Sequence, residues 1–254
     1  MSEYGIGNGA SLLIFIGIIA EFPLYIKKTF ILVSGGTNVI GVFFMVITLL
    51  VMIASIVYFQ EAERRVQVQY AKRVVGRKMM GAQSSYIPFR LIQGGVLPII
   101  FASALLQFPM LIGQYIQIDA VQVFFQRFYS YNSVLYNGSF ALLIFFFCYF
   151  YTAISFNPVE LSKQIKQNGG FILGVRPGKP TEEYLERTVS TLTLFGSLFL
   201  ASIALFPVIM ANITKVDSFQ GLGGTALLII VGVAMDLLRQ FDSFVVSAKY
   251  DGVS

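Results

Sequence analysis

Hydrophobic residues fall in long blocks separated by shorter polar segments. Six blocks are long enough to form membrane-crossing helices, because a bilayer core needs about 20 consecutive apolar residues. These helices satisfy their own backbone hydrogen bonds in lipid. The predicted fold class is therefore all-α: one polytopic transmembrane helix bundle of about six spans over residues 1–254. The predicted spans are residues 10–26, 39–58, 94–116, 139–156, 189–211 and 223–243.

Two polar segments, residues 59–90 and 157–188, are too long for simple helix connections. Each has about 30 residues, and connections of that length are often functional. In the first segment, Val66, Val68 and Tyr70 alternate with polar residues. This period of two predicts a short strand or extended ribbon.

The second polar segment contains a turn signature at residues 174–178, which read GVRPG. Thr181 follows closely and precedes Glu182 and Glu183. A Thr side chain can cap a helix, and acidic residues favour the positive end of its dipole. We therefore expect a helix to start at about Thr181.

Basic residues are distributed asymmetrically between the two sides of the predicted bundle. Residues 59–90, residues 157–188 and the C-terminal tail carry fourteen Lys and Arg, against four on the other side. The positive-inside rule makes the richer side cytoplasmic. We expect the C-terminus there, and the N-terminus too because the span number is even.

The composition excludes several classes of function. Hydrophobic residues make up 56% of the chain and charged residues only 12%, too few to cover a soluble domain of this length. The sequence has no His and a single Cys, Cys148. It therefore offers no Ser-His triad, disulfide framework or common zinc motif. We expect no enzymatic activity and no cofactor.

Several unusual motifs occur in a characteristic order. They are GIGNG at 5–9, Arg64-Arg65 with YAKR at 70–73, GGVLPIIFAS at 94–103, FNP at 156–158 with GVRPG at 174–178, and GGTALLI at 223–229. In order and spacing the chain resembles SecY, the pore-forming subunit of the Sec protein translocation channel. That fold has ten helices in two inverted halves. The resemblance implies that this chain supplies helices five to ten, the C-terminal half. We expect a partial sequence that lacks the N-terminal half.

The resemblance implies a pore ring of small aliphatic side chains at mid-membrane. An apolar constriction blocks ions by dewetting, yet makes no strong bond to a passing chain. On sequence alone, such residues face lipid or a neighbouring helix, and only the resemblance selects them. The ring positions are Ala10, Ile14, Ile100 and Ile229.

A lateral gate is the second implied feature, through which hydrophobic segments leave the channel sideways into lipid. Small residues permit close helix contact, and Pro weakens the helical hydrogen-bond ladder. Ordinary membrane-helix packing explains the same residues without any gate. The implied gate residues are Gly94, Gly95, Pro98, Ser103, Ala104 and Phe108. At Ile92 the chain departs from the family, where Asn is frequent.

The basic segments are the third implied feature, a docking face for the ribosome and the motor ATPase SecA. Guanidinium and ammonium groups suit RNA phosphates or acidic protein surfaces. Membrane topology and attraction to anionic headgroups explain most of these charges equally well. The implied docking residues are Arg64, Arg65, Lys72, Arg73 and Arg176. Further implied partners are SecE, SecG, translocating polypeptides, membrane lipids and the missing N-terminal half of the channel. The resemblance also implies a cell inner (plasma) membrane, with a plastid thylakoid as the alternative.

Two alternatives compete with a protein-conducting channel that passes secretory proteins and releases hydrophobic segments. A small-molecule secondary transporter also has multiple spans and broken helices, but it usually needs a polar site at mid-membrane. An intramembrane enzyme needs paired carboxylates, a Ser-Lys pair or His. The predicted spans contain few charged residues, among them Glu21 and Asp236.

Overall fold

The computed structural model describes most of the chain. The described residues are 9–34, 39–70, 74–75, 78–79, 84–115, 133–214 and 223–251. Lys72 and Arg73 of the predicted docking face lie outside these ranges. Ala10 lies in a described helix, but its side chain falls outside the description.

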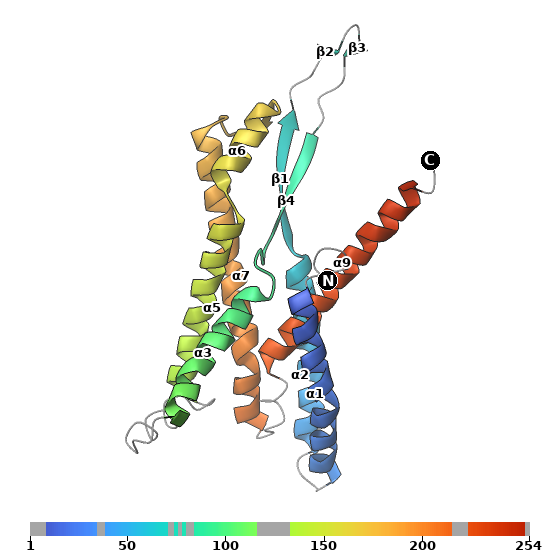
Figure 1. Ribbon diagram of the computed structural model, residues 1–254, viewed down its shortest axis with the longest axis vertical. Coiled ribbons are helices and arrows are strands. Elements are labelled where there is room, and N and C mark those ends of the chain that lie inside the picture. Colours follow the sequence, from blue (N-terminus) through green and yellow to red (C-terminus); the bar gives the residue numbers. More distant parts are fainter. Residues whose placement is uncertain are drawn as a thin grey trace.

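Within these ranges, six helices of at least 19 residues run alternately in opposite directions along the long axis (Figure 1). This matches the predicted helix bundle. They are α1 (Gly9–Ser34), α2 (Val39–Glu61), α3 (Leu97–Tyr115), α5 (Val134–Ser155), α7 (Lys179–Thr214) and α9 (Gly224–Asp251).

The outer surfaces of these helices are apolar. On α2, Phe43, Phe44 and Leu50 are all more than half exposed. Such a surface is unfavourable in water but matches lipid. Among the described residues, α2, α5, α7 and α9 are long and apolar enough to cross a membrane. The apolar stretch of α3 is shorter, and α1 carries Glu21, Lys27 and Lys28, so the six-span count stays a prediction for those two.

The bundle core forms where α7 meets α2, α3, α5 and α9. Fully buried side chains from each helix meet there, and the Phe59 and Phe199 rings stack with centroids 3.7 Å apart. Because lipid tails are as apolar as these side chains, close van der Waals packing holds the helices together here. The largest fully buried side chains of this core are Met52, Ile56, Ile99, Ile144, Leu200 and Leu228.

A three-stranded antiparallel sheet projects from one end of the bundle (Figure 1). Its order is β4 (Ser84–Arg90), β1 (Glu63–Tyr70) and β5 (Gly170–Ile172). The register opposes Val66 to Ile87 and Val68 to Ile172. The strand predicted from the alternation at Val66, Val68 and Tyr70 is therefore present. Beyond it, β2 (Val74–Val75) pairs with β3 (Lys78–Met79).

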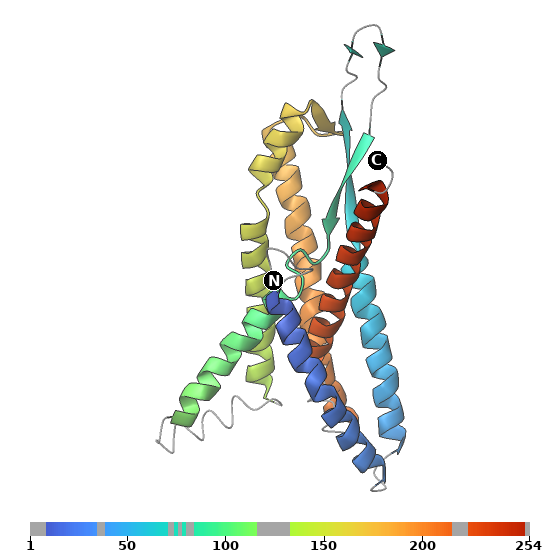
Figure 2. The ribbon, with the colours of Figure 1, turned by 45° about the vertical axis from the view of Figure 1, so that its right-hand side comes forward.

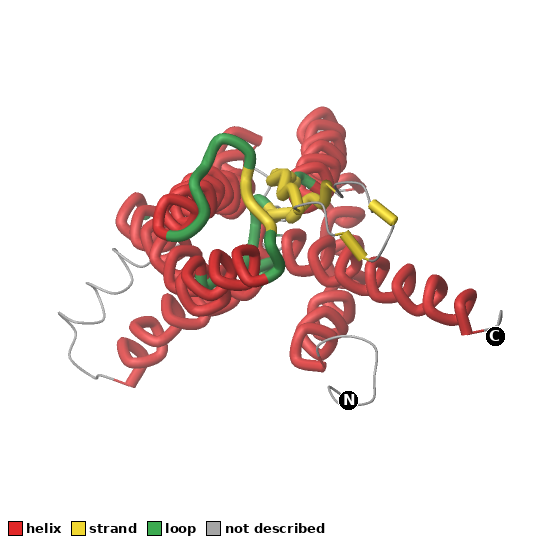
Figure 3. Tube along the Cα trace, turned by 90° about the horizontal axis from the view of Figure 1, so that it is seen from above, coloured by secondary structure: helices red, strands yellow, loops and turns green. Residues whose placement is uncertain are grey.

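A second apolar cluster holds the sheet against the helices. Val66 and Val68 share one face of β1 and are buried with Leu185 and Val189 of α7. The short helix α6 (Pro158–Gln167) contributes Ile165. Seen from above, the sheet lies near the middle of the molecule, whereas α9 runs outward toward the C-terminus (Figure 3). The two long polar segments are therefore folded against each other.

Helix α3 begins at Leu97, three residues after the start of the predicted span. Gly95 has φ 58°, a left-handed conformation that favours glycine, and Gly94 accepts the Leu97 amide at 3.3 Å. A Cβ on Gly94 would lie 2.8 Å from Pro98 Cγ. Gly94 and Gly95 therefore form a tight turn before the helix.

Helix α7 begins at Lys179, earlier than the start expected at Thr181 and ten residues before the predicted span. The Gly178 carbonyl accepts the amides of Thr181 and Glu182. The Thr181 hydroxyl instead donates to the Arg176 carbonyl at 2.9 Å. The capping position thus falls on Gly178, and Thr181 fastens the preceding turn.

Candidate functional site

An apolar cluster joins α1, α3 and α9, three helices that are far apart in sequence. Val96, Ile229 and Val233 are buried at its centre, and Ile14 and Ile100 pack against it. The first turns of α1 and α3 lie side by side in both views, and the two helices then diverge (Figure 2). Three of the four predicted ring residues, Ile14, Ile100 and Ile229, are thus brought into one cluster.

Gly232 permits α9 to approach the turn before α3. A Cβ at this position would overlap Val96 Cγ1 and would lie 2.9 Å from Gln60 Nε2. Only glycine fits there without displacing its neighbours. The close approach places the cluster directly beside the end of α2.

A polar group lies next to this cluster, at the end of the bundle that carries the sheet. Arg239 Nη2 donates to the Gln60 carbonyl at 2.8 Å, and Arg239 Nη1 lies 3.9 Å from Asp236 Oδ1. Gln60 is in the last turn of α2, where a cation offsets the negative end of the helix dipole. These side chains, with Arg90 and Gln93, line a cavity of about 190 Å³.

This polar group was missed by sequence reasoning. The i, i+3 spacing of Asp236 and Arg239 was visible, but Gln60 lies 179 residues away from Arg239. The acceptor is the Gln60 backbone carbonyl, and because every residue has such a group, the residue types alone do not predict this contact. Only the packing of α9 against α2 brings the pair together.

The predicted gate residues are dispersed around α3. Gly94 and Gly95 lie in the turn, and Pro98 is buried beside them. Ser103 donates its hydroxyl to the Ile100 carbonyl at 2.9 Å. Ala104 and Phe108 lie on an exposed apolar face, which Phe101, Leu105 and Leu111 continue.

The predicted docking residues lie at the end that carries the sheet. Arg64 and Arg65 are exposed on β1, and Arg65 Nε donates to Glu63 Oε1 at 2.7 Å. Arg176 is exposed between β5 and α7, and its backbone carbonyl accepts a hydrogen bond from the Thr181 hydroxyl. The structure thus places three of the five predicted docking residues at one end of the molecule.

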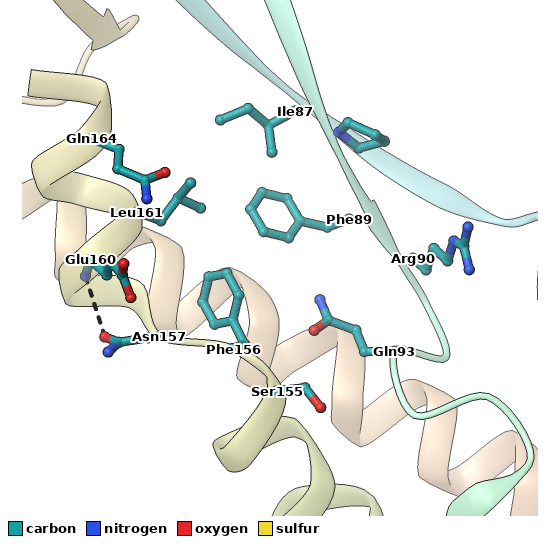
Figure 4. A pocket seen from close by; sticks show the side chains of 11 residues that line it. Ile87, Phe89, Arg90, Gln93, Ser155, Phe156, Asn157, Glu160, Leu161 and Gln164 are labelled. Carbon is teal, nitrogen blue, oxygen red and sulfur yellow. Dashed lines mark hydrogen bonds between the residues drawn. The ribbon is translucent and has the colours of Figure 1, made fainter. Parts of the chain in front are cut away.

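A pocket of about 590 Å³ between β4 and α6 was also missed (Figure 4). The Phe89 and Phe156 rings meet edge-to-face at 5.6 Å, next to Leu161. Asn157 caps α6 by accepting the Glu160 amide at 3.3 Å. No group of three or more His, Cys, Asp or Glu side chains among the described residues is placed to hold a metal ion.

A family model described as SecY matches residues 1–238. The chain belongs to the SecY family. The suspected resemblance and the helix-bundle fold class are both confirmed. The SecY relatives include the protein translocase subunit SecY of Thermotoga maritima, 41% identical over 99% of this chain and 56% of its own length. The Thermus thermophilus subunit of the same name is 43% identical over 99% of this chain and 58% of its own length.

Solved structures agree with the SecY assignment. One is described as "The structure of a protein conducting channel". The match covers 94% of this chain and 60% of the solved chain, with a TM-score of 0.63 and 20% sequence identity. A second, whose description concerns the plug domain of the SecY protein, gives a TM-score of 0.55 at 21% sequence identity. At these identities the likeness shows the fold alone. The chain spans somewhat more than half the length of the SecY relatives it matches.

Proposed function

We propose that this chain forms part of a protein-conducting membrane channel. The observation that carries the proposal is the convergence of Ile14, Ile100 and Ile229 from three helices on one apolar cluster in a SecY-family chain. The named relatives are translocase subunits, which favours a channel over a secondary transporter. Polypeptides pass through, and hydrophobic segments leave into the membrane.

The proposed mechanism is passive and rests on apolar side chains. Ile side chains around the path exclude hydrated ions by dewetting and offer a passing chain no strong bond. Helix α3 is the proposed moving wall, because Phe108 is 60% exposed and α3 packs chiefly against α5. Its displacement would open a sideways path to lipid, with Gly94, Gly95 and Pro98 at the hinge and Ser103 and Ala104 along the wall.

The energy that moves the polypeptide is proposed to come from a protein or ribosome bound outside the channel. SecA or the ribosome would dock on Arg64, Arg65, Lys72, Arg73 and Arg176, on the cytosolic side of a cell inner membrane. Exposure of Arg64, Arg65 and Arg176 supports this. SecE, SecG and the remaining part of the channel are the proposed membrane partners.

Crosslinking tests the proposed pore ring. We replace Cys148 by Ser and place a single Cys at residue 14, 100 or 229 in the complete translocase. A secretory polypeptide arrested in transit should crosslink to each of these positions. Ile144→Cys is the matched control, because Ile144 is fully buried against α7 and α3 in the bundle core. Equal crosslinking at residue 144, or none at the three ring positions, would refute the ring.

Charge reversal tests the docking face separately. Arg176→Glu in the complete translocase should slow SecA-driven export by about tenfold, because a reversed rim charge weakens association. Membrane insertion of the protein itself should stay normal. Lys163→Glu, exposed on α6, is the control and should have a smaller effect. Unchanged export in the Arg176 variant contradicts the role given to this residue.

A further inference from the structure

A pocket of about 320 Å³ lies between β1 and α7, apart from the apolar cluster of α1, α3 and α9. Arg64 and Arg187 line it together with Tyr184. Leu192 and Phe195 form its apolar part. The pocket therefore combines two cations with a hydrophobic floor.

The sheet explains why Arg64 reaches this pocket and Arg65 does not. Side chains alternate along a strand, so Arg64 shares the face of Val66 and Val68, which pack against α7. Arg65 points to the opposite face and pairs with Glu63 at 2.7 Å. Two adjacent arginines thus have different surroundings.

The two pocket guanidinium groups are not neutralised by neighbouring acids. Among the described residues, neither Arg64 nor Arg187 has a carboxylate within 4.0 Å. The hydroxyls of Thr188 and Thr191 donate to carbonyls of their own helix, each at 2.8 Å. The two arginines are therefore the cationic donors available to a bound anion.

The position of Arg187 along α7 sets its depth in a bilayer. Residues 188–214, from there to the end of α7, carry no charge. At about 1.5 Å per residue this stretch is about 40 Å long. The hydrocarbon core is about 30 Å thick, and about 40–45 Å with both headgroup layers. An uncharged helix that spans the core therefore brings Arg187 into one headgroup layer.

We propose that the β1–α7 pocket binds the phosphate of an anionic glycerophospholipid. The guanidinium groups of Arg64 and Arg187 donate to the phosphate oxygens, which suit their forked geometry. The acyl chains lie over Leu192 and Phe195, and Phe195 is 56% exposed. The apolar floor selects a lipid over free phosphate.

Native mass spectrometry of the detergent-purified translocase tests the proposal with two probes that differ only in headgroup, dioleoyl phosphatidylglycerol and dioleoyl phosphatidylcholine. Each arginine should contribute about fivefold to the preference for phosphatidylglycerol. Arg64→Gln and Arg187→Gln should therefore each weaken binding by about that factor, and both together by more. Arg65→Gln is the matched control and should retain the preference.

Two further arms keep the test decisive. Arg187→Lys keeps the charge and should retain part of the preference, even if a Gln variant fails to fold. Inorganic phosphate should not displace the bound lipid. Equal binding of the two lipids by the unaltered protein, equal losses in the Arg65 and Arg64 variants, or displacement by phosphate would each overturn the proposal.

Discussion

Helices α7 and α3 are both apolar and both contain an internal proline, yet they occupy different surroundings. Helix α7 packs against α2, α5, α6 and α9, and its Leu185 and Leu200 are almost completely buried. Helix α3 packs chiefly against α5 and leaves Phe108 exposed. The divergence of α3 from α1 is visible in Figure 2.

This difference in packing supports the proposal that α7 is fixed and that α3 moves. Displacing α7 would break close side-chain packing on several faces at once. Displacing the far end of α3 exposes far less new surface. The turn at Gly95 and the buried Pro98 hold its near end. We therefore assign α7 to the scaffold and α3 to the proposed moving wall.

The largest expected effect is a difference in stability between a variant in the buried face of α7 and a variant on the exposed face of α3. Leu200→Ala should lower the free energy of unfolding by about 2–5 kcal/mol, because it leaves a cavity in the packed bundle. Phe108→Ala should lower it much less, because that side chain is 60% exposed. Thermal unfolding in detergent measures both. Equal losses would remove the distinction between scaffold and moving wall.

The next effect tests the close packing of α7 against α9. A Cβ at Gly224 would overlap the Ile203 carbonyl, so Gly224→Ala should cost about 1–3 kcal/mol through backbone displacement. Gly138→Ala is the control within α5, where no atom lies within 4 Å of the added Cβ. That control should be neutral or slightly stabilising in the same thermal assay. A neutral Gly224 variant contradicts the packing.

The smallest effect concerns the link between α9 and α2. Arg239→Gln removes the hydrogen bond to the Gln60 carbonyl and should cost about 1 kcal/mol, since the group remains partly exposed. Asp242→Asn, exposed on the same helix, should leave the unfolding midpoint unchanged. Protection of the end of α2 in hydrogen exchange should fall only in the Arg239 variant. Equal protection in the two variants would show that Arg239 does not hold α2.

Local patterns predicted the elements, but they did not predict how those elements assemble. The alternation at Val66 and Val68 gave a strand, and the apolar blocks gave the helices. Helix α3 begins three residues after the start of the predicted span, because a run of apolar residues conceals the left-handed turn at Gly95. The β4–α6 pocket was missed because Phe89 and Phe156 are ordinary apolar residues until two segments fold together.

Hydrophobic periodicity in the sequence determined the apolar helices and the strand, and the ordered motifs carried the resemblance to SecY. These are local properties, set by backbone hydrogen bonding and by the transfer of side chains into lipid. The tertiary structure decided that Ile14, Ile100 and Ile229 meet, that Arg239 reaches α2, and that Arg64 faces α7 whereas Arg65 does not. Such contacts depend on shape complementarity between distant segments, which no single stretch of sequence encodes.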